Sequence, residues 1–469
     1  MVMGSLNQEV ETVVIGSGPG GYVAALRLAD LGKDVMLIEE KDRPGGTCLL
    51  EGCIPSKSLI NAVELGESAR HARQMGLTFG EMTVDHVKLR AWTDEVVSTL
   101  SNGVKGLLAK RGVEVIHARA RFEDAHTLSL DGGGTVSFQQ CIIATGSSLN
   151  RLPEGIDPTV WSSADALKLP EIPGSLLVVG GGYIGLEMGL VYAGLGSKVS
   201  VVEFFPRLLM GADLDLVEVM VKQVSTRLDE LLVESRVVSI KPRGDVFDVV
   251  IEHDGEQTTR QYDRVLVAIG RRPNSEDIGL ENLDVVVNAQ GFIETNGECR
   301  TGEPNIYAVG DVATGPMLAH KASREGKVAA EAICGHHVEF DNRAIPAVVF
   351  TDPEISWCGL TERHADELGV EIKIGRFPLS ALGRARAIGR TEGFVKIISE
   401  PGTDLLLGMG IVGPHASELI SEGALAIEMG ATLADLTDTI HPHPTLSEAI
   451  MEAAEVAAGT AVHIHAPKR

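Results

Sequence analysis

The sequence is poor in features that mark several other classes of protein. Aromatic residues make up only 4% of the 469 residues, which disfavours a β-sandwich whose core is filled by rings. No apolar stretch approaches the roughly 18 residues that a membrane-spanning helix needs, and the first residues lack the basic and apolar regions of a signal peptide. We therefore expect a cytoplasmic protein that has no membrane partner.

Positive charge is scarce as well. The chain has 41 Lys+Arg against 65 Asp+Glu, which gives a formal charge of −24, and no basic run offsets it locally. Such a chain repels phosphate backbones, so nucleic acid is not an expected partner. Glycine is abundant, with 53 residues, and hydrophobic residues make up 44%. The composition favours an α/β enzyme of several lobes whose backbone comes close to its ligands.

A glycine loop follows the first predicted strand. Residues 11–15 (ETVVI) have a strand pattern, and Gly16-Ser-Gly18-Pro-Gly-Gly21 leads from them into a helical pattern. Gly16 permits the tight turn, Gly18 lets the backbone approach a pyrophosphate, and Gly21 lets the helix pack closely on the strand. The next strand, DVMLIE, ends at Glu39, where an acidic side chain accepts hydrogen bonds from ribose hydroxyls. The segment predicts a dinucleotide site.

The chain then repeats this design. Strand SLLVV leads into Gly180-Gly-Gly182-Tyr-Ile-Gly185 and a helix, and the next strand ends at Glu203, at the same spacing as in the first copy. Two copies at one spacing predict two dinucleotide sites. A carboxylate at Glu203 would repel a 2′-phosphate, which favours NAD over NADP at the second site. Arg207 argues in the other direction, because an arginine near that position favours NADP. The alternative is that Arg207 is a solvated loop arginine.

Three apolar strands that end in glycine indicate crossings between lobes. They are CIIATGS around Gly146, VLVAIGRRPN around Gly270, and NIYAVGDV, which ends in Gly310-Asp311. An aspartate beside glycine at a strand end can bind a polyol hydroxyl, but it can equally cap its own loop. Asp311 stays open between these two interpretations.

The cysteines include one close pair, Cys48 and Cys53, and the rest are isolated: Cys141, Cys299, Cys334 and Cys358. A pair at the start of a helix, with Lys57 nearby, has thiolates stabilised by unpaired backbone N–H groups and by positive charge. The alternatives are half of a zinc site, for which no second pair exists, and a structural disulfide, whose short loop would stabilise little. The sequence favours redox chemistry and no metal.

A histidine and a glutamate lie close together near the C-terminus. The chain reads His441-Pro-His443-Pro-Thr445-Leu-Ser-Glu448 before an alanine-rich helix. Histidine titrates near neutrality and can take a proton from a dithiol, while a carboxylate on its other ring nitrogen orients it. His443 and Glu448 fit such a dyad, but Thr445 and Glu448 fit a helix capping box equally well. His441 is interpreted as an ordinary loop histidine.

The motifs around these residues resemble one family. The Cys-x4-Cys loop within GGTC…GCIPSK, between two GxGxxG loops, and the C-terminal HPHPTLSE are similar to the pyridine nucleotide-disulfide reductases, over nearly the whole chain from Val13. Within that family the most similar branch oxidises dihydrolipoyl groups with FAD and NAD⁺. One departure is Leu50-Glu51, where an Asn-Val-like pair is expected. Glu51 adds a negative charge between the thiols that would alter their redox poise.

The resemblance implies a fold and an assembly. The fold class is α/β, with two Rossmann-like dinucleotide-binding domains and a C-terminal α+β dimerisation domain. The implied domains are residues 1–150 (FAD-binding, with the cysteine loop), 151–272 (NAD-binding), 273–346 (return to the FAD-binding, central domain) and 347–469 (interface). The enzyme is a homodimer with active sites shared between subunits. Its substrate is a lipoyl-bearing carrier protein, of a 2-oxo acid dehydrogenase complex, the glycine cleavage system or another lipoate-dependent system.

The resemblance also implies how the reactive residues divide the work. Cys48 meets the substrate dithiol, and Cys53, nearer the flavin, passes the electrons to FAD. His443 is the base and Glu448 its partner, and both act on the cysteines of the other subunit.

Other residues are implied in cofactor binding. Lys57 and Glu187 match the family's ion pair beside the flavin, although either alone is more often a surface charge. Tyr183 either covers the nicotinamide pocket or packs as an ordinary helix tyrosine. The implied FAD contacts are Gly16, Gly18, Gly21, Glu39, Gly46, Thr47, Lys57, Ala120, Thr145, Gly146, Asp311, Met317, Leu318, Ala319 and His320. The implied NAD contacts are Gly180, Gly182, Tyr183, Ile184, Gly185, Glu187, Glu203, Val237 and Gly270.

Two other functions fit parts of this pattern. A glutathione or mercuric reductase shares the architecture, but Glu203 and the form of the motif at 54–57 (IPSK) disfavour the first, and a C-terminus without a cysteine pair disfavours the second. A flavoprotein scaffold without dithiol turnover is the alternative from a different class. Cys48, Cys53 and His443 together argue against it.

Overall fold

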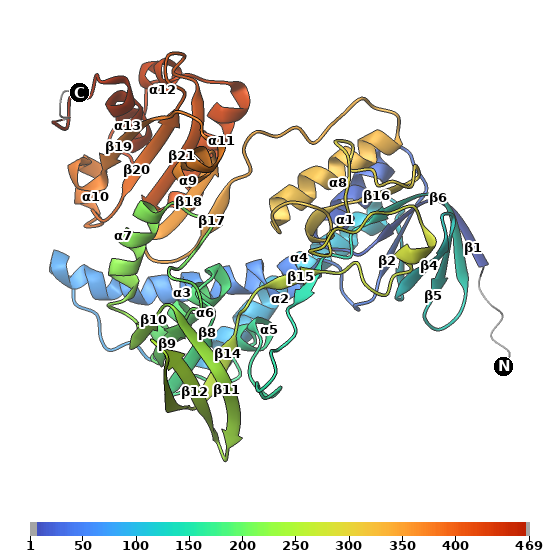
Figure 1. The fold of residues 1–469 in the computed structure, drawn as a ribbon, viewed down its shortest axis with the longest axis horizontal. Helices are drawn as coiled ribbons and strands as arrows, with labels where there is room; N and C mark the ends of the chain where they lie inside the picture. The colour runs from blue at the N-terminus through green and yellow to red at the C-terminus, as the bar shows by residue number, and fades with distance from the viewer. Residues whose placement is uncertain (1–6, 466–469) are drawn as a thin grey trace.

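The computed structural model describes residues 7–465, which form three lobes (Figure 1). The first lobe is built on a sheet with the strand order β3-β2-β1-β6-β5-β4, in which β16 also pairs with β6. Its central strands are parallel, and β4 and β5 form an antiparallel edge. The strands are β1 (Asn7–Ile15), β2 (Val35–Glu39), β3 (Glu114–His117), β4 (Ala120–Asp124), β5 (Thr127–Leu130), β6 (Thr135–Ile143) and β16 (Ile306–Ala308).

Helices α1 (Pro19–Asp30) and α4 (His86–Lys110) contact this sheet, and α8 (Ala319–Ile333) packs on α1. The same stretches of chain also form α2 (Gly46–Glu51) and α3 (Cys53–His71), with the short 3₁₀ helices η1 (Ala72–Met75), η2 (Leu280–Asn282) and η3 (Gly310–Val312). Helices α1 and α8 pack very closely, because a Cβ on Gly326 would lie 2.4 Å from the carbonyl oxygen of Gly20. The chain thus completes the first lobe with β16 and α8 only after it has built the second.

The second lobe joins a parallel sheet, in the order β10-β9-β8-β14, to an antiparallel sheet, β11-β12-β13. Its strands are β8 (Ser175–Val179), β9 (Lys198–Val202), β10 (Glu230–Leu232), β11 (Ser235–Arg243), β12 (Val246–His253), β13 (Glu256–Tyr262) and β14 (Arg264–Val267). Its helices are α5 (Ser163–Leu167), α6 (Tyr183–Leu195) and α7 (Leu214–Val224). A two-stranded ribbon of β7 (Ser147–Leu149) and β15 (Arg271–Pro273) marks both crossings between the first two lobes.

The third lobe is a five-stranded antiparallel sheet, in the order β17-β18-β21-β20-β19, with helices packed on it. The strands are β17 (Ala347–Val349), β18 (Glu354–Gly359), β19 (Lys373–Pro378), β20 (Phe394–Ser399) and β21 (Leu406–Gly413). The helices are α9 (Glu362–Leu368), α10 (Gly383–Ala387), α11 (Ala416–Met429), α12 (Leu433–Asp438), α13 (Glu448–Ala458) and the 3₁₀ turn η4 (Leu379–Ala381). None of the helices within residues 7–465 is long and apolar enough to cross a membrane.

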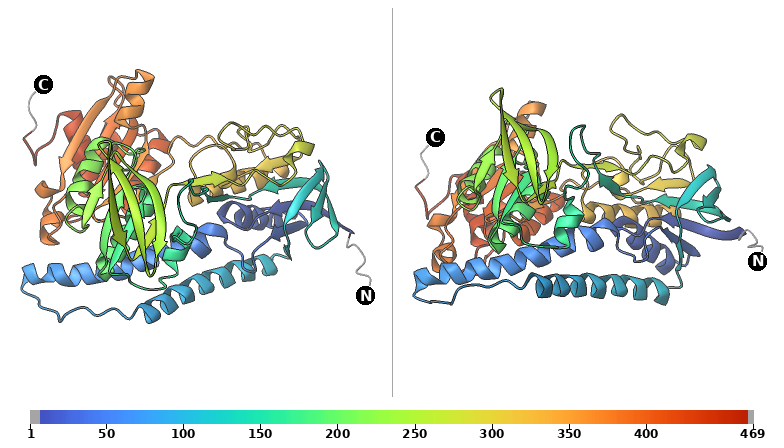
Figure 2. Two further views of the ribbon diagram at one scale, coloured as in Figure 1. Left: turned by 60° about the horizontal axis from the view of Figure 1, so that its bottom comes forward. Right: turned by 90° about the horizontal axis from the view of Figure 1, so that it is seen from below.

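Helix α3 connects the first two lobes, because it begins at the cysteine loop and packs on the second lobe. With α4 it forms a long antiparallel pair that runs along one side of the molecule (Figure 2). Leu59, Ile60 and Val63 of α3 belong to the apolar core of the second lobe, and a Cβ on Gly194 of α6 would lie 2.2 Å from a methyl group of Val63. Because Cys53 begins α3, packing against the second lobe sets the position of the redox cysteine.

The predicted fold class is confirmed, with two parallel-sheet lobes and an α+β C-terminal lobe. The expected strand at residues 11–15 is the second half of a longer strand, β1. Residues Asn7, Gln8 and Glu9 pair with Thr135, Val136 and Ser137 of β6. Their polar side chains give no apolar pattern, so the pairing with β6 alone extends the strand.

Candidate active site

A cavity of about 840 Å³ lies where the first two lobes meet. The first glycine loop, the cysteine loop, the crossing strands and the start of α6 all contribute to its walls. The residues expected at a flavin or nicotinamide that line it are Gly16, Gly18, Glu39, Gly46, Thr47, Cys48, Cys53, Lys57, Ala120, Thr145, Gly146, Tyr183, Ile184, Glu187, Asp311, Met317 and Ala319. The fold thus gathers in one space residues that are up to 300 positions apart.

The two glycine loops have the same local geometry. A Cβ on Gly16 would lie 2.3 Å from the carbonyl oxygen of Ala144, and a Cβ on Gly180 would lie 2.4 Å from that of Ala268. Both glycines have positive φ angles, of 100° and 111°. The last glycine of each loop is as crowded, because a Cβ on Gly21 or Gly185 would lie 1.8 or 2.0 Å from the carbonyl oxygen of the first glycine of its loop.

The middle glycines leave the helix starts open. Gly18 and Gly182 are the N-caps of α1 and α6, and neither helix has a side-chain cap. A Cβ on Gly182 would meet no atom within 4 Å, and one on Gly18 would meet only Gly46, at 4.0 Å. Unpaired backbone N–H groups at a helix start, without side chains in front of them, suit a pyrophosphate. The cavity therefore fits a dinucleotide at the first loop.

The acidic residue of each copy is buried and holds its own glycine loop. Glu39 accepts hydrogen bonds from the backbone N–H of Ser17, at 2.8 Å, and of Lys41, at 2.9 Å. Glu203 accepts from Gly181, at 2.6 Å, and Phe205, at 2.8 Å. A carboxylate has about four acceptor positions, so each retains capacity for a ribose hydroxyl.

The contacts of Arg207 do not favour binding of a 2′-phosphate. Its guanidinium donates to the carbonyl oxygens of Ala212, at 3.0 Å, and Met210, at 3.3 Å, within its own loop. Arg207 therefore stabilises its own loop through these two hydrogen bonds, whereas the alternative interpretation expected a side chain surrounded by solvent.

The cysteine pair has unequal electrostatics. Both are free thiols in the structure, and both line the cavity. A hydrogen bond from Cys48 and the nearby ammonium of Lys57 lower the pKa of Cys53 to about 7, against the opposing effect of burial. The same hydrogen bond, together with burial, raises the pKa of Cys48. In the reduced pair, these opposite shifts favour the thiolate on Cys53 and the thiol on Cys48.

Lys57 and Glu187 form the ion pair that the resemblance implied, with 2.8 Å between Nζ and Oε2. The side chain of Glu187 is only 4% exposed, and its other oxygen accepts a hydrogen bond from the backbone of Phe350, at 3.1 Å. The Lys57 ammonium lies 4.3 Å from the centre of the Phe350 ring. Phe350 belongs to the third lobe, and no local sequence pattern indicated its place beside Lys57.

A chain of hydrogen bonds joins the crossing strands at the cavity. Asp311 accepts from the Ser147 hydroxyl at 2.6 Å, and that hydroxyl accepts from Arg271 Nε at 2.8 Å. Both Asp311 and Arg271 line the cavity. The carboxylate of Asp311 therefore accepts its hydrogen bond from Ser147 of the crossing strand β7 and does not cap its own loop. Arg271 was missed from the sequence, although an arginine directly after a strand-ending glycine was visible there.

Tyr183 and Glu51 also line the cavity. Tyr183 starts α6 and is 42% exposed, so it is not packed as an ordinary helix tyrosine. Although Tyr183 is partly exposed, the surrounding protein desolvates it, and this together with the nearby Asp311 raises the pKa of Tyr183 to about 12. Glu51 forms an ion pair with Lys41, at 2.8 Å. Its negative charge is therefore partly balanced by a lysine, which the sequence pattern did not reveal.

His443 and Glu448 come together as a dyad. His443 Nδ1 lies 2.8 Å from Glu448 Oε1, and Glu448 Oε2 accepts a hydrogen bond from the backbone of Thr445 at 2.8 Å. The Thr445 hydroxyl instead donates to Pro442, so half of the capping box forms. Although burial opposes them, these hydrogen bonds hold the pKa of Glu448 below its usual value. With Nδ1 committed to the carboxylate, Nε2 is left to accept a proton.

His441 lies in a loop, as expected, but its side chain is only 4% exposed. Nε2 lies 2.7 Å from Glu422 Oε1, and Nδ1 lies 2.9 Å from the carbonyl oxygen of Thr439. Because α11 carries Glu422 beside the segment before α13, His441 is a buried anchor of that segment.

Some expected residues lie away from the cavity. His443 and Glu448 are in the third lobe and do not line it, and the His443 side chain is 76% exposed. Gly21, Gly180, Gly182, Gly185, Leu318, Glu203, Val237, Gly270 and His320 are also absent from its walls. His320 points to the carbonyl oxygen of Pro346, at 2.7 Å. Within one described chain, the base and the thiols are therefore separate.

The geometry defines a class of protein. A close pair of cysteine thiols faces a cavity that fits a dinucleotide, and a second glycine loop of the same design opens beside it; this is the arrangement of a nucleotide-dependent thiol oxidoreductase. The chain belongs to the pyridine nucleotide-disulphide oxidoreductases, whose family pattern matches residues 10–326 and whose dimerisation domain matches residues 345–454. The predicted family and enzyme class are confirmed. Enzymes of this family use FAD and NAD(H), as predicted, and the dimerisation domain supports a homodimer.

Several characterised proteins are similar along their whole length. Dihydrolipoyl dehydrogenase of Geobacillus stearothermophilus is 44% identical over 468 residues, 99% of each chain. That of Bacillus subtilis is 44% identical over 469 residues, 99% of this chain and 100% of the relative. Among solved structures, LpdA of Mycobacterium tuberculosis superposes with a TM-score of 0.86 at 29% identity, covering 95% of this chain and 99% of that one. The HOCl-induced flavoprotein disulfide reductase RclA of Escherichia coli reaches 0.84 at 28%, with the same coverage.

Proposed function

We propose that this chain oxidises protein-bound dihydrolipoyl groups to the lipoyl disulfide, with NAD⁺ as the electron acceptor. The dihydrolipoyl dehydrogenases, at 44% identity over nearly the full length, support this substrate class. The observation that carries the proposal is the unequal pair of Cys48 and Cys53 in the dinucleotide cavity, with the pKa of Cys53 lowered to about 7. FAD, when bound in the cavity, supplies the two-electron acceptor between the thiols and NAD⁺.

The chain's own residues divide the thiol chemistry. His443 of one subunit takes the proton of a dihydrolipoyl thiol at Nε2, and the resulting thiolate attacks Cys48 of the oxidised pair. Cys53 leaves as a thiolate, which the ammonium of Lys57 stabilises. The second dihydrolipoyl thiol then displaces Cys48, so that one disulfide forms and one is reduced. Glu448 holds the imidazole in the required tautomer and stabilises its charged form.

We further propose that the homodimer is the active unit. His443 is largely exposed and lies outside the cavity of its own chain, and the chain has a dimerisation domain. The site is complete if His443 reaches the cysteines of the partner. We also propose the domains expected from the sequence, residues 1–150, 151–272, 273–346 and 347–469; the separate sheets and the β7–β15 crossing support this division.

Nucleotide contacts are part of the proposal. The cavity-lining residues around the first glycine loop are proposed to hold FAD, with Lys57 and Glu187 beside the flavin ring. The second glycine loop and Glu203 are proposed to hold NAD, and Tyr183 to cover the nicotinamide pocket. We also propose the cytoplasm as the compartment, because free thiols such as Cys141, Cys299 and Cys358 stay reduced there.

Assays on three substrates test the function. Holoenzyme with NAD⁺ should oxidise dihydrolipoamide and lipoylated carrier proteins, while glutathione disulfide and Hg²⁺ with reduced nucleotide should give little turnover. Turnover with glutathione disulfide or Hg²⁺ that exceeds turnover with dihydrolipoamide would refute the proposal. Comparison of carrier proteins from different lipoate-dependent systems then identifies the physiological partner.

A further inference from the structure

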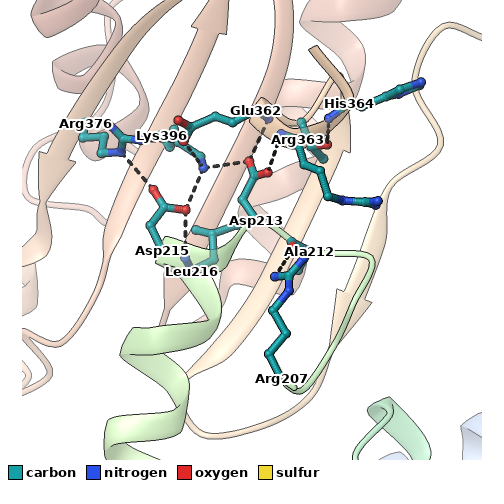
Figure 3. Close-up of polar contacts among 11 residues, drawn as sticks. Arg207, Ala212, Asp213, Asp215, Leu216, Glu362, Arg363, His364, Arg376 and Lys396 are labelled. Carbon is teal, nitrogen blue, oxygen red and sulfur yellow. Dashed lines mark hydrogen bonds and ion pairs between the residues drawn. The ribbon is translucent and has the colours of Figure 1, made fainter. Parts of the chain in front are cut away.

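A fully buried lysine lies between three carboxylates at the contact of the second and third lobes. Lys396 of β20 is 0% exposed, and its Nζ lies 2.7 Å from oxygens of Asp213, Asp215 and Glu362. Arg376 of β19 pairs with Asp215 and Glu362 as well. We call these five residues the Lys396 cluster (Figure 3).

The Lys396 cluster is a charged site, although burial works against it. Burial alone would lower the pKa of Lys396, but its hydrogen bonds to the three carboxylates raise that pKa above its usual value. Asp215 responds in the opposite direction: its bonds to Lys396 and Arg376 outweigh burial and lower its pKa. The three carboxylate oxygens lie within 4.8 Å of one another. Without an ammonium among them, they would repel each other strongly.

The cluster joins two lobes. Asp213 and Asp215 stand at the start of α7 in the second lobe, whereas the other members belong to the third. Asp213 also accepts hydrogen bonds from the backbone N–H groups of Glu362 and Arg363, at 3.1 and 3.4 Å. Figure 3 shows these contacts converging on Asp213 from the strand and the helix of the third lobe.

Local packing accommodates the lysine. Gly410 of β21 lies opposite Lys396 in the sheet. A Cβ on Gly410 would lie 2.9 Å from Leu216 of α7 and 3.5 Å from Cε of Lys396. The absence of a side chain there lets α7 rest on the sheet directly beside the buried ammonium.

The segment between β9 and α7 connects the cluster to the second nucleotide site. We call residues 203–213 the nucleotide loop. It begins at Glu203, whose carboxylate binds the second glycine loop through the N–H of Gly181. Arg207 braces it from within, and it ends at Asp213, in the cluster. Both ends of the loop are therefore held by charged groups.

We propose that Lys396 is a positioning residue for the nicotinamide nucleotide. Its ammonium fixes the far end of the nucleotide loop to the third lobe, and this holds Glu203 at the ribose position. Lys396 does not touch the nucleotide itself; it acts through Asp213 and the loop. The inference rests on the proposed binding of NAD at the second glycine loop. If so, the third lobe, which contains the dimerisation domain, helps to hold the second nucleotide site in place.

The test is a Lys396→Met variant of the FAD-loaded enzyme, since methionine keeps the length and removes the charge. The KM for NAD⁺ should rise roughly 2- to 30-fold, the usual range for a remote positioning effect, while kcat and the KM for dihydrolipoamide stay within about twofold of wild type. The matched control is Lys373→Met. This lysine of β19 pairs with Asp404 at 2.9 Å inside the third lobe, so all constants should stay unchanged.

A lower melting temperature with an unchanged KM for NAD⁺ would overturn the inference, as would equal rises for both substrates. If Lys396→Met does not fold, the same kinetic constants are measured for Asp215→Asn. Asp215 is partly exposed, and its replacement removes one ion pair with Lys396 and one with Arg376. It should raise the KM for NAD⁺ by a smaller factor, and an unchanged value overturns the inference. Wild-type enzyme that binds no nicotinamide nucleotide in a direct titration would instead refute the proposed function.

Discussion

Replacement of Lys57 by methionine tests the electrostatics of the thiol pair. The ammonium of Lys57 lowers the pKa of Cys53, while the carboxylate of Glu187 raises it. An opposite charge within about 4–6 Å shifts an acid by about 1–3 pKa units. Lys57→Met removes the favourable charge and leaves a 4% exposed carboxylate without its partner. We expect the pKa of Cys53 to rise from about 7 to ~8 or above, a loss of at least about 1.4 kcal/mol of thiolate stabilisation.

The assay is the long-wavelength absorption of a thiolate beside the flavin in the two-electron-reduced holoenzyme, followed against pH. Because the band needs the thiolate, it grows as the pH rises through the pKa, with a midpoint near 7 in wild type. Lys57→Met should move the midpoint up and Glu187→Gln should move it down. Lys373→Met, which removes a lysine paired with Asp404 in the third lobe, should leave it unchanged. The same midpoint in all four proteins would refute the reasoning.

Three further outcomes follow from the site. Glu51→Val should change the two-electron potential by less than about 30 mV, because the Glu51 side chain is 41% exposed and solvent screens its charge; a larger shift in a redox titration contradicts this. NADP⁺ should support less than about one tenth of the NAD⁺ activity, and Arg207→Ala should not raise that fraction, since Arg207 binds loop carbonyls; a steady-state comparison decides. Glu422→Gln, which weakens the anchor at His441, should lower kcat for dihydrolipoamide and leave NADH oxidation by an artificial acceptor intact; a parallel loss of both would show general damage.

The parts of the site that the sequence predicted are those built from continuous segments. Each glycine loop and its acid belong to one strand–loop–helix–strand unit, so spacing along the chain reflects distance in space. The tight contacts at Gly16 and Gly180 follow directly from that unit. The pair of His443 and Glu448 is also local, because His443 lies five residues before Glu448, the first residue of α13.

The parts that the sequence did not reveal join distant segments. Phe350 reaches Lys57 from the third lobe, and Arg271 reaches Asp311 through Ser147. Each such contact depends on how lobes pack, which no short pattern encodes. The partner of His441 was not foreseen for the same reason, because Glu422 lies on another segment, helix α11. The members of the Lys396 cluster come from four separate segments, so in the sequence each of them looks like an ordinary charged residue.

The central claim is that electrons pass through the Cys48–Cys53 pair. The direct measurement is NADH formation from dihydrolipoamide by Cys48→Ser and Cys53→Ser variants that retain FAD, compared with Cys334→Ser as a matched control on an isolated cysteine. The account predicts that both active-site variants lose NADH formation while the control keeps wild-type activity. Retained turnover in both Cys48→Ser and Cys53→Ser would contradict it.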